Sequence, residues 1–182
     1  MSDLSQTDAL FYDRTGMDPE QVGGIVREAL SGMDDGELFL EYSLSEGFSF
    51  DDGKLKSAAF DTAQGFGLRG VSGEATGFAH SGELSEAAIR RAGETVKAVR
   101  EGRAGTLAEP PRGTNASLYT DANPLNAVPF ETKVRLLAEM DSYARGRDPR
   151  VRQVMCSLSG EWRAVQIVRP DGVRVGDIRP LV

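Results

Sequence analysis

The sequence predicts an α+β fold, an antiparallel sheet with helices packed on one side and ending in an incomplete strand. Three segments carry apolar residues at helical spacing, while others alternate between apolar and polar residues between glycine- or proline-containing turns. Strands joined by tight turns form antiparallel sheets, and a helix with one apolar stripe must cover a face of such a sheet.

The first half of the chain contains a loose start, a helix and a meander of strands. Residues 1–18 are polar, so we expect a loose segment there, and a helix begins at Asp18-Pro19 because proline suits the first helical turn. Residues 37–46 alternate as a strand, and Asp51-Asp52-Gly53 is typical of a hairpin turn. Further strands over residues 54–79 give a meander of about five strands.

The second half contains two helices, a long connection and a final group of strands. We expect helices over residues 84–101 and 129–146, joined by a turn-rich connection over 102–124. The apolar stripe of the second helix consists of Val134, Leu137, Met140 and Ala144. The strand over 151–159 turns at Gly160 into a strand over 162–169. The segment 173–182 has an apolar pattern that stops unfinished, so we expect the chain to continue beyond Val182.

Composition limits the class of protein. The 182 residues suffice for a core without disulfides, and a single cysteine fits a reducing compartment. No signal-peptide pattern opens the sequence and no apolar run approaches the length of a membrane span, so we expect a cytoplasmic protein without a membrane partner. The net charge of −7 argues against nucleic-acid binding. The first 52 residues alone carry thirteen acidic residues and two arginines, which fits a solvated surface with charges at helix ends better than a surface that faces a basic partner.

The glycine-rich stretch over residues 64–82 raises the question of a phosphate-binding loop. The spacing G-x-G-x-x-G occurs at Gly65, Gly67 and Gly70, but the residues that follow do not form a helical pattern. A phosphate loop requires a helix N-terminus whose backbone N–H groups converge on the anion. Two strands joined near Ser72-Gly73-Glu74 fit the sequence better, with the glycines marking bulges or close backbone contacts.

Residue chemistry indicates no active site in this sequence. His80 is the only histidine and Cys156 the only cysteine, so a metal cluster or a thiol–imidazole pair has little support, and Cys156 fits a small buried residue. Glutamates at 37, 41 and 46 fit a solvated strand face, and Met140 and Tyr143 fit a core or flanking position. We therefore assign no catalytic, cofactor-binding or metal-binding residue.

Several short segments together carry a resemblance to a known family. In the first half they are QGFGLR at 64–69, VSGE at 71–74 and TGFA at 76–79. The second half adds DPRV at 148–151, QV at 153–154, SLSGE at 157–161 and DIRPLV at 177–182. Over residues 20–182 the chain resembles the TldD/TldE (PmbA) peptidases, and the TldD side in particular.

The resemblance implies a zinc metallopeptidase that works with a TldE-like partner, as a heterodimer, on unfolded or flexible peptides. The roles it implies are maturation of a microcin precursor and degradation of an antitoxin. The family motif is His-Glu-x-x-x-His with a later cysteine, and its glutamate acts as base on zinc-bound water. Here His80 precedes Ser81, so the motif is absent. Residues 19–182 then represent a non-catalytic TldD-like N-terminal domain, a fragment of a chain more than twice as long whose zinc lies in the C-terminal half.

Two alternatives remain at the level of sequence. The chain could belong to the TldE side, which lacks the zinc motif, or it could be a stand-alone acidic domain for protein interaction. The sequence beyond Val182 separates these possibilities, because only the TldD-like reading requires the zinc motif there.

Overall fold

The computed structural model describes residues 4–98 and 119–182, which form two compact units. Unit 1 comprises residues 4–42, 63–98 and 164–178, and unit 2 comprises residues 43–62, 119–163 and 179–182. Five strands form one open antiparallel sheet in the order β3-β2-β1-β4-β5, so the predicted α+β class is confirmed. Strands β1, β2 and β4 contribute residues to both units.

Three strands are longer than the sequence patterns predict. Strand β1 spans Asp35–Asp51, β2 spans Lys54–Ser72 and β4 spans Met155–Val168, with β3 at Ala75–Ser81 and β5 at Arg174–Leu181. The expected turn at Gly160 is wrong, because this glycine lies inside β4 and a Cβ atom there would meet Leu125 Cδ2 at 2.7 Å. We expected a meander of about five strands before residue 82, but the structure has three strands there, β1, β2 and β3. A glycine inside a strand can mark close packing as readily as a turn.

The hairpin turns predicted at Asp51-Asp52-Gly53 and near Gly73 are present in the structure. Asp52 and Gly53 connect β1 to β2 with φ of 51° and 75°, and Gly73 connects β2 to β3 with φ of 59°. Gly172, with φ of 89°, lies in the turn before β5. These positive angles strain most side chains but cost glycine little.

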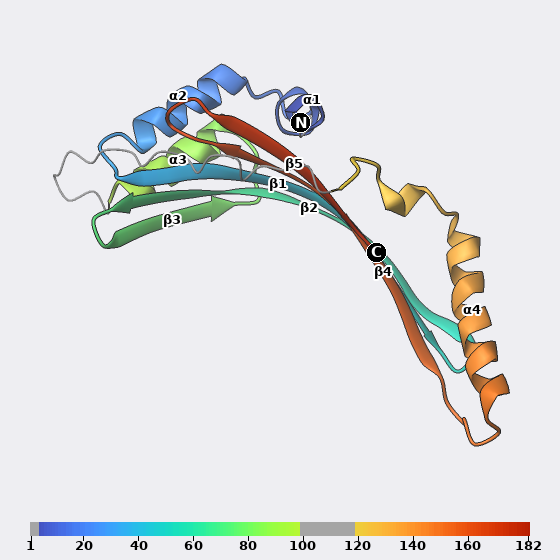
Figure 1. Ribbon diagram of the computed structural model, residues 1–182. Helices are drawn as coiled ribbons and strands as arrows, with labels where there is room; N and C mark the ends of the chain where they lie inside the picture. The colour runs from blue at the N-terminus through green and yellow to red at the C-terminus, as the bar shows by residue number, and fades with distance from the viewer. Residues whose placement is uncertain (1–3, 99–118) are drawn as a thin grey trace. The chain divides into compact units, whose positions relative to one another are not determined.

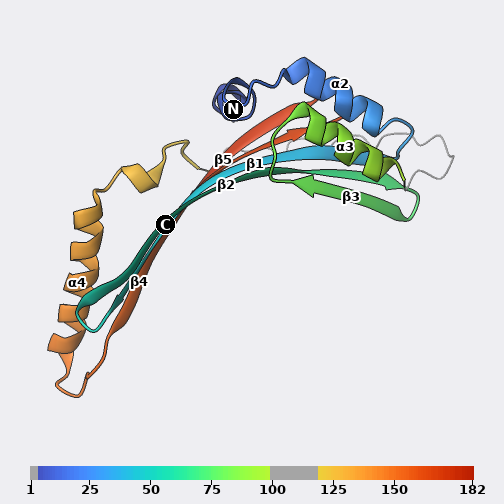
Figure 2. The same ribbon diagram turned by 180° about the vertical axis from the view of Figure 1, so that it is seen from behind.

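Helices α2 and α3 cover one face of the sheet in unit 1 (Figures 1 and 2). Helix α2, Pro19–Ala29, begins at Asp18, whose carboxylate accepts from the backbone N–H groups of Glu20 and Gln21. Helix α3, Glu86–Lys97, begins at Ser85, whose hydroxyl accepts from Ala88 N. One core joins both helices to the sheet. Its fully buried members include Val22, Val26, Leu38, Leu40, Leu68, Ile89 and Val96.

Unit 2 consists of β-strand segments with helix α4, Phe130–Arg147, on one face. A short 3₁₀ turn, η2 at Pro124–Asn126, precedes this helix. Phe48 and Phe50 of β1 lie beneath Leu137 of α4 in a small second core. The end of the helix predicted over 84–101 and most of the connection predicted over 102–124 lie outside the described residues.

Residues 4–13 of the N-terminal segment form helical turns, whereas a loose segment was expected over 1–18. Helix α1, Leu4–Asp8, continues into a π-helical turn, η1, at Ala9–Asp13. The Tyr12 hydroxyl donates to Gln166 Oε1 at 2.7 Å, and Gln166 Nε2 donates to Thr7 Oγ1 at 3.0 Å. Gln166 is fully buried, so this segment satisfies the polar groups of a core residue 154 positions away.

We expect Tyr12→Phe to lower the free energy of unfolding by about 1–3 kcal/mol, because it leaves the buried Gln166 Oε1 without its donor. Tyr143→Phe is the matched control at a tyrosine that is 67% exposed, and it should change stability by less than about 0.5 kcal/mol. Urea denaturation followed by circular dichroism measures both. Equal stability of Tyr12→Phe and the parent chain would contradict this role of the N-terminal segment.

Candidate functional site

The glycine-rich stretch forms adjacent strands of unit 1 and no phosphate loop. Residues 64–72 belong to β2, and β3 pairs with them antiparallel, with Arg69 opposite Phe78 and Gly67 opposite His80. The structure therefore confirms the preference for a sheet. A phosphate loop would need a helix directly after the glycines, and here a strand follows the turn.

The glycines of β2 allow other parts of unit 1 to pack closely against the backbone of this strand. A Cβ atom on Gly65 would lie 2.7 Å from the backbone oxygen of Ser81, on the neighbouring end of β3. A Cβ atom on Gly70 would overlap Met33 Sδ and lie 2.6 Å from Val96 Cγ1 of helix α3. The missing side chains thus serve packing between strands and between sheet and helix.

A groove of about 420 Å³ lies on this part of the sheet. Its lining combines backbone and aromatic rings, and it comprises Phe39, Glu41, Ala63, Gln64, Gly65, Phe66, Gly67, Phe78, His80, Ser81 and Gly82. The rings of Phe78 and His80 stack with centroids 5.8 Å apart. Arg14 donates to Gln64 Oε1 at 2.5 Å at the edge of the groove. The groove therefore offers aromatic surface and a few polar groups.

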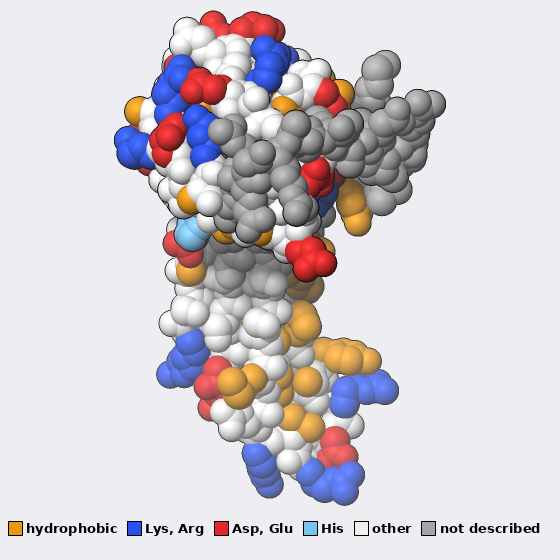
Figure 3. Space-filling model, turned by 90° about the vertical axis from the view of Figure 1, so that its left-hand side faces the viewer, with side chains coloured by type: hydrophobic (Ala, Val, Ile, Leu, Met, Phe, Trp, Pro, Cys, Tyr) orange, Lys and Arg blue, Asp and Glu red, His pale blue; other side chains and the backbone are white. Residues whose placement is uncertain are grey.

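His80 is exposed, and Figure 3 shows the single histidine side chain in pale blue at the surface. Among residues 4–98 and 119–182, no group of three His, Cys, Asp or Glu side chains could hold a metal ion. A zinc site needs three or four such ligands converging on one point. The residues around His80 therefore do not fit zinc.

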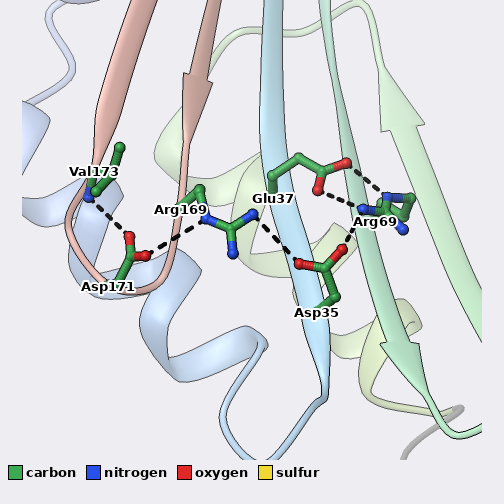
Figure 4. Close-up of polar contacts among 6 residues, drawn as sticks. All are labelled: Asp35, Glu37, Arg69, Arg169, Asp171 and Val173. Atoms are coloured by element: carbon green, nitrogen blue, oxygen red, sulfur yellow. Dashed lines mark hydrogen bonds and ion pairs between the residues drawn. The ribbon is translucent and has the colours of Figure 1, made fainter. Parts of the chain in front are cut away.

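Arg69, from the QGFGLR segment, binds two carboxylates of β1 (Figure 4). Its Nε lies 2.7 Å from Glu37 Oε1 and its NH2 group 2.8 Å from Asp35 Oδ2. On the other side, Arg169 NH1 lies 3.3 Å from Asp35 Oδ1, and Arg169 also pairs with Asp171 at 3.5 Å. The charges thus alternate across β2, β1 and the turn after β4.

This network shifts the pKa values of its members. The hydrogen bond to Glu37 is the main reason that the pKa of Arg69 is raised, with Asp35 adding to it. Burial raises the pKa of Asp35, but the hydrogen bonds from Arg69 and Gly36 and the charges of Arg69 and Arg169 outweigh burial, so the pKa is lowered. Both groups therefore stay charged at neutral pH and hold adjacent strands in register. The sequence carries no signal of this network, because the pairs that join Asp35 or Glu37 to an arginine are 32 to 134 positions apart.

Unit 2 contains a buried ion pair beneath helix α4. Lys133 Nζ lies 2.5 Å from Glu46 Oε1, and their side chains are 8% and 5% exposed. Lys133 also donates to the backbone oxygen of Leu125 at 2.7 Å. The prediction that Glu46 belongs to a solvated strand face is wrong, because α4 covers it and supplies the opposite charge.

Helix α4 buries charged residues and exposes apolar ones. Its buried residues are Lys133, Leu137 and Asp141, whereas Met140 is 46% exposed and Leu136 is 47% exposed. The predicted apolar stripe is therefore correct for Leu137 and wrong for Met140. A pocket of about 480 Å³ opens beside the helix. Its lining comprises Glu46, Pro124, Ala127, Val128, Thr132, Lys133, Arg135, Leu136, Glu139, Leu158 and Val182.

Cys156 lies under the same helix in a half-buried position. Its Sγ donates to the backbone oxygen of Leu137 at 3.5 Å. Burial, followed by the negative charge of Asp141, raises the pKa of the thiol. A raised pKa keeps the thiol protonated at neutral pH, so the cysteine lacks the activation that nucleophiles need.

Two family models match this chain. The family model of PmbA/TldA metallopeptidase domain 1 matches residues 36–101, and that of the PmbA/TldA metallopeptidase central domain matches residues 123–182. The chain belongs to the TldD/TldE (PmbA) family. The domain 1 match contains the β2–β3 stretch and the groove, and the central-domain match contains helix α4 and the strands that follow.

Curated members of the TldD/TldE family resemble this chain over most of its length. A metalloprotease TldD homologue from Haemophilus influenzae is 35% identical over 153 residues, which are 82% of this chain and 32% of that protein. One from Buchnera aphidicola subsp. Schizaphis graminum is 32% identical over 151 residues, 82% of this chain and 31% of that protein. The chain therefore spans about a third of the length of the curated relatives it matches.

Two solved structures share this fold. A candidate modulator of DNA gyrase from Bacteroides thetaiotaomicron has a TM-score of 0.66 at 16% identity, over 88% of this chain and 38% of that chain. TldE from Thermococcus kodakarensis has a TM-score of 0.59 at 14% identity, over 88% of this chain and 37% of that chain. At these identities the likeness concerns the fold.

We expect Gly70→Ala to destabilise the chain by about 1–3 kcal/mol, because the added methyl group overlaps Met33 and Val96. Gly47→Ala is the control, as nothing lies within 4 Å of a Cβ atom there, and it should change stability by less than about 0.5 kcal/mol. Thermal unfolding measures both variants. Equal losses would show that space at Gly70 is not the constraint.

Breaking the buried ion pair should cost more than replacing it. Lys133→Met or Glu46→Leu alone should lower the free energy of unfolding by about 3–5 kcal/mol, and the double variant should lose clearly less than either. Each single change leaves one buried charge without its partner, whereas the double change leaves none. As a control, Arg135→Met removes an exposed pair with Glu139 and should cost at most about 0.5 kcal/mol. Additive losses in the double variant would contradict the pairing.

Proposed function

We propose that this chain is the N-terminal, non-catalytic part of a TldD-like zinc metallopeptidase. The observation that carries the proposal is its membership of the family together with 35% identity to a protein described as a metalloprotease TldD homologue. The sequence holds a single histidine, whereas the family zinc motif needs two. The matched 153 residues are only 32% of the first of these relatives, which leaves room for the motif elsewhere in a longer protein.

The zinc of this proposal is held by another part of the protein. His80 and Cys156 lie in different units, and neither belongs to a group of three ligands among the described residues. When bound, the zinc would polarise the scissile peptide carbonyl and activate water. The residues of this chain contribute surface instead: the groove around Phe78 and the pocket beside α4 help to shape the substrate cavity and the partner interface.

The proposed partner is a TldE-like subunit and the proposed substrates are unfolded or flexible peptides, as in peptide maturation and antitoxin degradation. The fold shared with TldE from Thermococcus kodakarensis supports a TldD/TldE-type assembly, since two subunits of one fold can pair pseudo-symmetrically. We also propose a cytoplasmic location, with neither nucleic acid nor membrane as partner. No helix in the described part of the chain is long and apolar enough to cross a membrane.

A second candidate function is that of the TldE-like partner itself. The structural likeness to TldE supports it, but that likeness is at 14% identity, whereas the curated relatives described as TldD homologues reach 35%. We therefore favour the TldD side. A stand-alone acidic interaction domain has less support, because each of these relatives extends well beyond the matched region.

The test compares this chain with a longer reading frame that contains it. Expressed alone, the 182 residues should bind no stoichiometric zinc by elemental analysis and should leave an unfolded peptide intact. The longer protein, mixed with a TldE-like subunit, should bind zinc and cleave the peptide, and a chelator should abolish cleavage. Cleavage by the chain alone would overturn the non-catalytic role. A longer protein without His-Glu-x-x-x-His that supports cleavage only beside a TldD subunit would favour the TldE assignment.

A further inference from the structure

The pocket of about 480 Å³ beside α4 has two buried opposite charges in its wall, those of Lys133 and Glu46. Their side chains are 8% and 5% exposed, and Lys133 Nζ lies 2.5 Å from Glu46 Oε1. Around them the wall is apolar, through Val128, Leu136 and Leu158. Sites for small molecules commonly have volumes of about 300–1,000 Å³, mostly apolar walls and a few polar groups at fixed positions. The pocket therefore has the composition of a ligand site.

The charged pair keeps hydrogen-bonding capacity that the described part of the chain does not use. An ammonium group has three N–H donors, and Lys133 donates to Glu46 Oε1 and to the backbone oxygen of Leu125. The ring centroid of Phe48, 5.8 Å from Nζ, is at the outer limit of a cation–π contact and too far for a hydrogen bond. On Glu46, the bond from Lys133 occupies Oε1 and leaves Oε2 as an acceptor. A ligand in the pocket meets one cationic donor and one anionic acceptor.

These two groups select a ligand by its charges. An apolar carboxylate could accept from Lys133 but would bring its charge beside Glu46, whereas an apolar amine could donate to Glu46 but would lie beside Lys133. Like charges close together at a poorly solvated site are strongly unfavourable. A compound with both charges on neighbouring groups satisfies both residues. An α-amino acid carries its ammonium and carboxylate groups on one carbon atom, which matches a pair whose own charges are 2.5 Å apart.

Helix α4 favours one orientation of such a ligand. Its first turn reaches the pocket through Thr132, and the partial positive charge at a helix N-terminus attracts a carboxylate. Arg135 and Glu139 also line the pocket, and they are 67% and 69% exposed with Nε and Oε1 3.9 Å apart. The exposed rim thus repeats the order of a cation beside a carboxylate. Leu136, which lies between them in the sequence, supplies apolar surface for a side chain.

We propose that the pocket beside α4 binds a free α-amino acid with an aliphatic side chain. The carboxylate of the ligand accepts from Lys133, its ammonium group donates to Glu46, and its side chain packs against Leu136 and Leu158. All four residues belong to unit 2. The site goes beyond the proposed peptidase role, because the chain binds the amino acid whether or not a longer protein holds zinc.

An NMR titration of the ¹⁵N-labelled 182-residue chain with L-leucine tests the site. Amide signals at the start of α4 should shift in a saturable way, with a dissociation constant of about 1 mM or lower. 4-Methylpentanoate, which is leucine without its ammonium group, and 3-methylbutylamine, which is leucine without its carboxylate, should each bind at least about tenfold more weakly. The absence of a saturable shift up to about 10 mM leucine, or equal affinity for either analogue, would overturn the proposal.

Leu136→Glu and Met140→Glu are a matched pair of variants. The two residues lie one turn apart on α4 and are 47% and 46% exposed, but of the two only Leu136 lines the pocket. Leu136→Glu should raise the dissociation constant for leucine at least about tenfold, because it places a charge against the aliphatic side chain. Met140→Glu should leave it within about twofold of the parent value. The NMR spectra show whether each variant is folded, and equal effects of the two changes would contradict the site.

Two further titrations test the charged pair and the whole protein. The double variant Lys133→Met/Glu46→Leu removes both charges and should show no saturable shift with leucine, so parent-like binding would overturn their role. Val182 also lines the pocket, so leucine binding is measured again on a longer reading frame that contains this chain. Binding there supports a site in the whole protein, and loss of binding there would overturn it. Neither result depends on whether the longer protein cleaves peptides.

Discussion

The close approach of backbone and core side chains at the glycines of β2 is the constraint on which unit 1 depends. Space at Gly70 lets Met33 and Val96 reach the sheet, and space at Gly65 lets the end of β3 come against β2. A side chain at either position would push apart elements that the same core holds together. The residues that most resemble the TldD/TldE family therefore have a packing role first, and the aromatic groove follows from it.

Charged residues stabilise the two units in different ways. In unit 1, Arg69 and Arg169 both pair with Asp35 at the partly exposed surface of the sheet. Such exposed pairs add little to the free energy of unfolding, so the network mainly fixes the register of the strands. In unit 2, Lys133 and Glu46 are almost fully buried. A buried pair contributes little net stability but strongly disfavours any arrangement that separates its members. The pair thus fixes where α4 lies on its strands.

Helix α4 of unit 2 buries charged residues and exposes apolar ones. Lys133 and Asp141 of this helix are buried, whereas Leu136 and Met140 are exposed, and Leu136 lines a pocket of about 480 Å³. The groove of unit 1 has a different character, with exposed aromatic rings over a glycine backbone.

The sequence by itself determined the features that depend on neighbours a few residues away. The helix start at Asp18, the Asp52-Gly53 turn, the sheet nature of the glycine stretch and the family itself followed from local chemistry and motif order. Only the tertiary structure decided that Glu46 is buried, because its partner Lys133 lies 87 positions away. Likewise, the order of the N-terminal segment depends on Gln166, and the place of Gly160 inside β4 depends on contact with Leu125. Such contacts join residues that share no local pattern, so periodicity and propensity carry no signal of them.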